Sequence, residues 1–177
     1  EVPSLALGVN DVSIFEMVGA FGTFVNKGEH TTPYYIDRIE DKNGNVIQQF
    51  TPKKRPAMSE EHAYLMTYML RGGFEESAGT SQGVPSSIRE GNELGGKTGT
   101  TQKIIDGKYS NTHHVASFSG FFPADNPRAV ITVVVDEPKM KKGRLGYGGS
   151  VAGPSFKNIA SRLITYLGIQ PKPNELS

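Results

Sequence analysis

The clearest pattern in the chain is an apolar stripe at helical spacing that begins after Ser13 and stops at Gly28. Ser13 and Glu16 have the spacing of a capping box, in which each side chain bonds a backbone amide that the first helical turn leaves unpaired. Apolar residues then recur every three or four positions, which predicts a helix with one buried face. The residues of this stripe are Ile14, Met17, Val18, Phe21, Phe24 and Val25.

Two further segments have the same spacing and are expected to be helices. The first begins at Ser59 and is expected to end at Gly72-Gly73, because Ser is a favoured N-cap and Gly commonly follows a helix. The second has Pro154 near its first turn and Gly168 at its end. The apolar positions expected to be core are Ala63, Met66, Met69 and Leu70, then Phe156, Ile159, Ala160, Leu163, Ile164 and Leu167.

Four segments predict β-strands in two antiparallel pairs. Residues 34–39 and 46–50 flank Lys42-Asn43-Gly44-Asn45, whose Asn-Gly favours a type I′ turn, so we expect a peripheral hairpin. Residues 115–122 and 129–135 flank a turn rich in Pro, Asp and Asn. The last segment is apolar at nearly every position, as in a strand covered on both faces. The pattern predicts an α+β fold with an antiparallel sheet covered by helices.

Composition narrows the possible functions. The chain has 177 residues, of which 36% are hydrophobic, so it can bury a sizeable core. Its net charge of +1 gives no surplus for a nucleic-acid partner, and none is predicted. The absence of Cys excludes thiol catalysis and Cys-based zinc sites. Adjacent residues on a strand point to opposite faces, so His113 and His114 could not easily bind one metal ion. We expect this pair to lie at a loop-to-strand boundary, and we expect neither a metal nor a cofactor.

The remaining segments are irregular. Residues 72–93 are rich in Gly, Ser, Glu and Pro, and long segments of this kind inside a domain are often functional. Residues 139–144 form a basic run that predicts a solvated loop. We expect residues 1–170 to form one structural unit and residues 171–177 a frayed tail.

The strongest candidate chemistry lies where two known motifs overlap. Gly91-Asn92-Glu93-Leu94-Gly95-Gly96-Lys97-Thr98 matches the phosphate-loop pattern at every position. A phosphate loop needs a buried strand before it and a helix that opens at Lys-Thr. Here residues 86–90 are polar, and Gly99-Thr100-Thr101 places a helix breaker and β-branched residues after the motif. We therefore disfavour a nucleotide site and interpret the segment as Lys-Thr-Gly on an edge strand.

A Lys-Thr-Gly strand is suited to binding a carboxylate. Lys97 and Thr98 could hold the anion through charge-assisted hydrogen bonds. Gly99 would let a ligand backbone lie close to the strand. The amide that follows, at Thr100, could then point at a developing oxyanion.

This motif resembles the Lys-Thr-Gly strand of penicillin-binding proteins and serine β-lactamases. Other segments are similar to high-molecular-mass penicillin-binding proteins, so the resemblance extends over almost the whole chain. The early segments look closer to the bifunctional type and the later ones to the monofunctional type. The resemblance implies that the chain is the C-terminal half of a penicillin-binding transpeptidase fold. The segments are residues 3–8, 20–28, 39–44, 95–102, 119–123 and 147–154.

The resemblance implies a D,D-transpeptidase that cross-links peptidoglycan through a serine acyl-enzyme and is acylated by β-lactam antibiotics. Lys97, Thr98, Gly99 and Thr100 would bind the terminal carboxylate of a stem peptide ending in D-Ala-D-Ala. The Thr100 backbone amide would be an oxyanion donor. The implied location is extracytoplasmic, in the periplasm or on the outer face of the membrane, with the anchor in a segment outside this chain.

Two motifs of that family, Ser-x-x-Lys and Ser-x-Asn, occur nowhere in the 177 residues. They would carry the nucleophile, the base and a proton-transfer group. We therefore expect a second polypeptide segment to supply them and this chain alone to be inactive. Two alternatives stay open: a catalytically inactive penicillin-recognition or sensor module, and a β-lactamase.

Overall fold

The computed structural model describes residues 3, 8, 10–81, 93–139 and 146–170. The predicted segments at 82–92, 140–144 and 171–177 lie outside the described residues. Within the described part, no helix has the length and apolar content needed to cross a membrane. The elements are α1 (Ile14–Val25), β1 (Glu29–Thr31), β2 (Arg38–Glu40), β3 (Val46–Gln49), β4 (Lys54–Pro56), α2 (Glu60–Glu75), β5 (Gly95–Ile105), β6 (Lys108–Phe122), β7 (Ala129–Asp136), α4 (Gly148–Val151) and α5 (Gly153–Tyr166).

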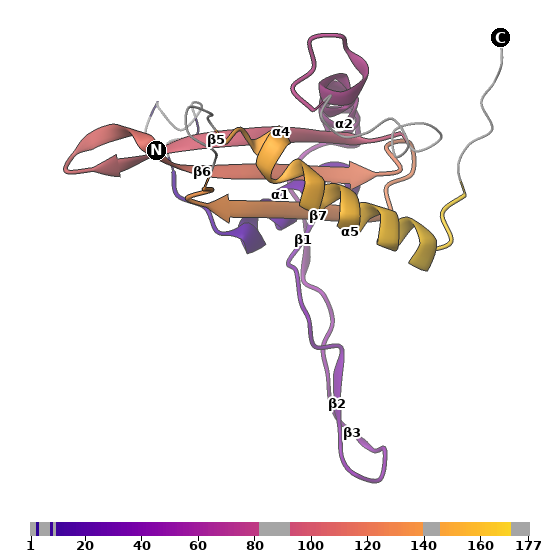
Figure 1. The fold of residues 1–177 in the computed structure, drawn as a ribbon. Coiled ribbons are helices and arrows are strands. Elements are labelled where there is room, and N and C mark those ends of the chain that lie inside the picture. The colour runs from indigo at the N-terminus through magenta and orange to yellow at the C-terminus, as the bar shows by residue number, and fades with distance from the viewer. Residues whose placement is uncertain (1–2, 4–7, 9, 82–92, 140–145, 171–177) are drawn as a thin grey trace, which may run out of the picture.

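The centre of the fold is a three-stranded antiparallel sheet in the order β5-β6-β7. Helix α5 crosses one face of this sheet and α1 lies behind the other, which confirms the predicted α+β fold (Figure 1). Val130 of β7 packs towards α1, and Ile131 packs towards α5. Both faces of β7 are therefore covered, as expected, although Val134 near its end remains 37% exposed.

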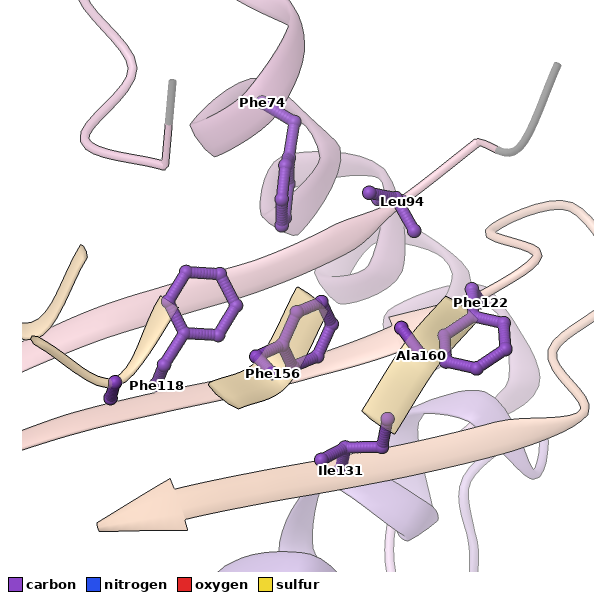
Figure 2. Packing of buried hydrophobic residues seen from close by; sticks show 8 residues of the cluster. Phe74, Leu94, Phe118, Phe122, Ile131, Phe156 and Ala160 are labelled. Carbon is purple, nitrogen blue, oxygen red and sulfur yellow. The ribbon is translucent and has the colours of Figure 1, made fainter. Parts of the chain in front are cut away.

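The main core lies between the sheet and α5 and is built from phenylalanine rings (Figure 2). The Phe118 and Phe156 ring centroids are 4.6 Å apart, and Phe74 of α2 meets Phe118 edge-on at 5.8 Å. Phe118, Phe122 and Phe156 have no exposed surface. Because each ring buries a large apolar area, these contacts hold α2 and α5 against the same sheet.

Helix α1 begins where the capping box predicted. The Ser13 amide donates to Glu16 Oε2 at 2.8 Å, and the Glu16 amide donates to Ser13 Oγ at 3.2 Å. Phe21 of the predicted stripe packs against Phe121 of β6 in a second, smaller core. Ile14 is 52% exposed, so the buried face begins later than the stripe indicated.

Helix α2 differs from its prediction at its C-terminal end. Ser59 is the N-cap, as expected, but the helix continues through Gly72 and Gly73 to Glu75. A Cβ atom at Gly73 would lie 3.0 Å from the Gly96 carbonyl oxygen, so the glycine permits close helix–strand packing. Burial of Phe74 outweighs the weak helix propensity of the two glycines. Met69, expected in the core, is 62% exposed.

Helix α5 has the predicted start and end. Pro154 lies in its first turn, and Gly168 adopts a φ of +63° just beyond the helix. The Ile169 amide donates to the Ile164 carbonyl at 3.0 Å, the long hydrogen bond of a Schellman motif. Phe156 and Ala160 are buried, but Ile159, expected on the same face, is 41% exposed.

The β2–β3 hairpin projects away from the sheet as a narrow ribbon (Figure 1). Its position agrees with the prediction, except that residues 34–37 lie outside β2, and its turn is not type I′. That turn needs positive φ at both central residues, whereas here Gly44 has a φ of +84° and Asn43 is not in the positive region. The Gly44 amide donates to the Asp41 carbonyl at 3.1 Å. The Asp41 carboxylate also accepts from the Asn43 and Asn45 amides, at 2.8 and 2.9 Å, which favours this local geometry.

Candidate active site

Strand β5 carries all the residues of the Lys-Thr-Gly motif and lies at an edge of the described sheet. Thr98 and Thr100 share one face of the strand, and Lys97 and Gly99 share the other, because side chains alternate. Lys97 and Thr98 are inside a strand, so no helix opens at them. This excludes the phosphate-loop interpretation.

Both threonine hydroxyls have partners from distant segments. Thr98 Oγ1 lies 3.1 Å from Thr80 Oγ1, in the turn after α2. Thr100 Oγ1 accepts a hydrogen bond from the Gly148 amide, the first residue of α4, at 3.2 Å. The structure therefore gathers the end of α2, strand β5 and the start of α4 around one face of the motif.

Two glycines allow close contacts at this site. A Cβ at Gly99 would collide with Ser117 Oγ on β6, and one at Gly148 would collide with the carbonyl oxygens of Ser117 and Gly99. The sequence suggested that Gly99 leaves room for a ligand. In the structure Gly99 also leaves room for the Ser117 side chain, and Gly148 lets α4 pack directly on the backbones of β5 and β6.

Two lysines on β5 have different electrostatic surroundings. Lys103 Nζ lies 2.6 Å from Asp136 and 2.9 Å from Glu137, and these carboxylates, Asp136 first, raise the pKa of Lys103. Lys97 is exposed, and its Nζ donates to the Thr98 carbonyl oxygen at 3.0 Å. Among the described residues no carboxylate lies within ion-pair distance of Lys97. Its positive charge is therefore not neutralised by this part of the chain.

The histidine pair lies within β6, so the predicted loop-to-strand boundary is wrong. His114 is buried and its Nε2 lies 3.0 Å from the Gly146 carbonyl oxygen, whereas His113 is exposed near Ser110. The described ranges contain no group of three or more His, Asp or Glu side chains arranged to bind a metal. Asp136 ends β7.

Comparison with known proteins decides the family. The model described as the penicillin binding protein transpeptidase domain matches residues 2–161. The chain belongs to this family. The resemblance inferred from the sequence is thereby confirmed, and the Lys-Thr-Gly motif of β5 lies within the matched range.

Named relatives of this transpeptidase family align over most of the chain. Stage V sporulation protein D of Bacillus subtilis is 38% identical, over 93% of this chain and 25% of its own length. The probable peptidoglycan D,D-transpeptidase PenA of Neisseria flavescens is 32% identical, over 90% of this chain and 36% of its own length. The chain thus spans well under half of each relative.

Solved transpeptidase structures have the same fold. Penicillin binding protein 3 of Mycobacterium tuberculosis, in complex with aztreonam, superposes with a TM-score of 0.81 at 26% identity. The match covers 96% of this chain and 38% of that one. A D,D-transpeptidase domain from Eggerthella lenta gives a TM-score of 0.68 at 26% identity, with 87% of this chain and 32% of that one covered.

Sequence reasoning identified the β5 motif but not its neighbours. Thr80 fell within a segment interpreted only as irregular, and Gly148 was noted only as part of a similar stretch. A weak signal was present in both places: Gly79 precedes Thr80, and Gly148 and Gly149 are adjacent glycines shortly before Pro154. Glycines beside a polar residue are consistent with close backbone approach, but they do not say to which strand.

Proposed function

We propose that this chain forms the carboxylate-binding wall of a peptidoglycan D,D-transpeptidase. One observation carries the proposal: two threonine hydroxyls lie on the same short stretch of an edge strand as Lys97, which has no carboxylate partner among the described residues. An anion is the ligand that such a cation and such donors favour. The terminal carboxylate of a stem peptide ending in D-Ala-D-Ala has this chemistry, and so has the carboxylate of a β-lactam.

Each of the four motif residues would have a separate role in binding the substrate. Thr98 and Thr100 would donate hydroxyl hydrogen bonds to the carboxylate from one face of β5. Lys97 starts on the other face, but its four-carbon side chain can bend around the edge of the described sheet, where its charge attracts the anion. The Thr100 amide would donate to the oxygen that becomes negative in the tetrahedral intermediate, and Gly99 would keep the strand close to the ligand.

The nucleophile would come from a second polypeptide segment carrying Ser-x-x-Lys and Ser-x-Asn. Its serine oxygen would attack the carbonyl carbon of the penultimate D-Ala, and the bond to the terminal D-Ala would break with a proton transferred to the departing amine. The acceptor amine of another stem peptide would then take the acyl group and release the serine. This chemistry belongs outside the cytoplasm, with the anchor in a segment outside this chain.

Labelling the full-length protein with a fluorescent penicillin tests the proposal. We expect one stable labelled band, and release of D-Ala when a stem peptide replaces the penicillin. Absence of label would overturn the proposal in favour of an inactive recognition module. Rapid loss of label would indicate a β-lactamase instead.

The two lysines of β5 provide a matched pair of variants. Lys97→Ala should lower the second-order rate constant of labelling by about 10- to 100-fold, because it removes a charge-assisted interaction. Lys103→Ala removes the same charge from the same strand, but there the carboxylates of Asp136 and Glu137 already neutralise it. It should leave the rate constant within about twofold. Equal losses in both variants would contradict a specific role for Lys97.

A further inference from the structure

Thr80 lies in a short turn that is fixed to the end of α2. On one side of it the Gly79 amide donates to the Glu76 carbonyl at 2.9 Å, and on the other the Ser81 amide donates to the Gly73 carbonyl at 3.0 Å. A Cβ at Gly79 would collide with the Gly73 carbonyl oxygen, so the turn packs tightly on the helix. The position of Thr80 is therefore set by α2, while its own side chain remains exposed.

The turn also meets the other two elements of the site. Thr80 Oγ1 lies 3.1 Å from Thr98 Oγ1. A Cβ at Gly149 would lie 3.1 Å from the Thr80 carbonyl oxygen and 3.5 Å from Thr98 Cγ2. Thr80 thus lies between α2, β5 and α4, next to the hydroxyl that would meet a carboxylate.

The two threonines of β5 differ in what their partners can do. A hydroxyl has one proton to donate and lone pairs to accept with. Thr100 Oγ1 accepts from the Gly148 amide, which can only donate, so the Thr100 proton is left for another acceptor. Thr98 Oγ1 donates its proton to Thr80 Oγ1 at 3.1 Å, so in the absence of a ligand this proton is already used. A hydroxyl can also donate, so this hydrogen bond would reverse if the Thr80 hydroxyl turned towards Thr98 Oγ1.

We propose that Thr80 is a positioning residue for the carboxylate site of β5, a role that rests on the proposed function. Without a ligand, the Thr98 proton is donated to Thr80. When a carboxylate binds, Thr98 donates to the carboxylate and Thr80 reverses to donate to Thr98 Oγ1. The hydrogen bond from Thr80 to Thr98 and the one from Thr98 to the carboxylate then form a chain, in which each bond polarises the other.

Replacing the Thr80 hydroxyl tests this role in the full-length protein. Thr80→Val keeps the size of the side chain and removes the hydroxyl, and Thr80→Ser keeps the hydroxyl. The measurement is the second-order rate constant of acylation by benzylpenicillin and by its methyl ester, which lacks the negative charge. We expect Thr80→Val to slow benzylpenicillin roughly three- to tenfold, to change the ester less than about twofold, and Thr80→Ser to restore the rate constant.

Three results would overturn the inference. Equal losses with the acid and the ester would mean that Thr80 acts on the fold and not on the carboxylate. No loss with the acid would mean that Thr98 needs no partner. If the wild-type protein reacts with neither compound, the proposed function fails first, and the role of Thr80 fails with it. Should Thr80→Val not fold, Thr80→Ala gives the same comparison, since the side chain is exposed.

Discussion

The carboxylate-binding wall, formed by β5 and α4, and the ribbon, formed by β2 and β3, are stabilised by different kinds of contact. In the wall, each threonine hydroxyl bonds to a residue from a distant part of the chain, and glycines allow the backbones to touch. In the ribbon, every residue of both strands is exposed, and the turn is closed by groups within five positions of Asp41. A site made by long-range packing should respond to distant changes, whereas a locally bonded ribbon should not.

The largest effect should come from the core that supports the wall. Phe156→Ala removes a fully buried ring that packs on Phe118, and should lower the free energy of unfolding by about 3–5 kcal/mol in chemical denaturation. Ile159→Ala, one turn along the same helix but 41% exposed, should cost less than half of that. Similar losses for the two variants would mean that α5 does not cover the sheet as described.

A second effect should come from the contact between α4 and β5. Gly148→Ala places a methyl group against the carbonyl oxygens of Ser117 and Gly99, and should cost about 1–3 kcal/mol and slow penicillin labelling. Gly22→Ala is the control, because a Cβ there meets no atom within 4 Å and Ala favours a helix. It should leave labelling unchanged. Unchanged labelling in Gly148→Ala would show that α4 does not shape the site.

A smaller effect is expected from the ribbon turn. Gly44→Ala puts a side chain at a φ of +84° in open space, so only the backbone conformation is penalised, by about 1 kcal/mol. Penicillin labelling of the full-length protein should be unchanged. Loss of labelling would mean that the ribbon affects the site, and would contradict the view that the ribbon is stabilised only by local contacts.

The smallest effect concerns the pH dependence of the same turn. Hydrogen bonds from the Asn45 side chain, then from the Asn45 and Asn43 amides, lower the pKa of Asp41 below its ordinary value of 3.8. A lowered pKa means that the turn gains stability above that value and loses it as pH falls through the folded-state pKa. The Asn45 amide signal in an NMR titration should therefore move with a midpoint below 3.8. A midpoint at or above it, or an unchanged curve in Asp41→Asn, would contradict the turn geometry.

Sequence reasoning succeeded where a structure depends on neighbouring residues. The Ser13 and Glu16 cap, the Pro154 and Gly168 boundaries, and the paired apolar strands all follow from local rules. It failed where burial of a side chain determines where an element ends. At Gly72-Gly73 the helix was expected to end, but packing of Phe74 favours its continuation to Glu75. The predicted type I′ turn at Asn43-Gly44 was wrong for another reason, since the Asp41 carboxylate favours a different local geometry.

The candidate site divides along the same line. The spacing of Lys97, Thr98 and Thr100 indicates their chemistry, because these residue types in a strand are suited to an anion. Their partners Thr80 and Gly148 lie far away in sequence, and no periodicity or composition predicts which residues a folded sheet brings together.

The most direct test is a crystal structure of the full-length protein acylated by benzylpenicillin. The account predicts that the carboxylate of the bound penicillin lies within about 3.2 Å of the Thr98 and Thr100 hydroxyl oxygens, with Lys97 turned towards it. A carboxylate that lies in solvent, or against residues away from β5, would contradict the assignment of this strand as the carboxylate-binding wall.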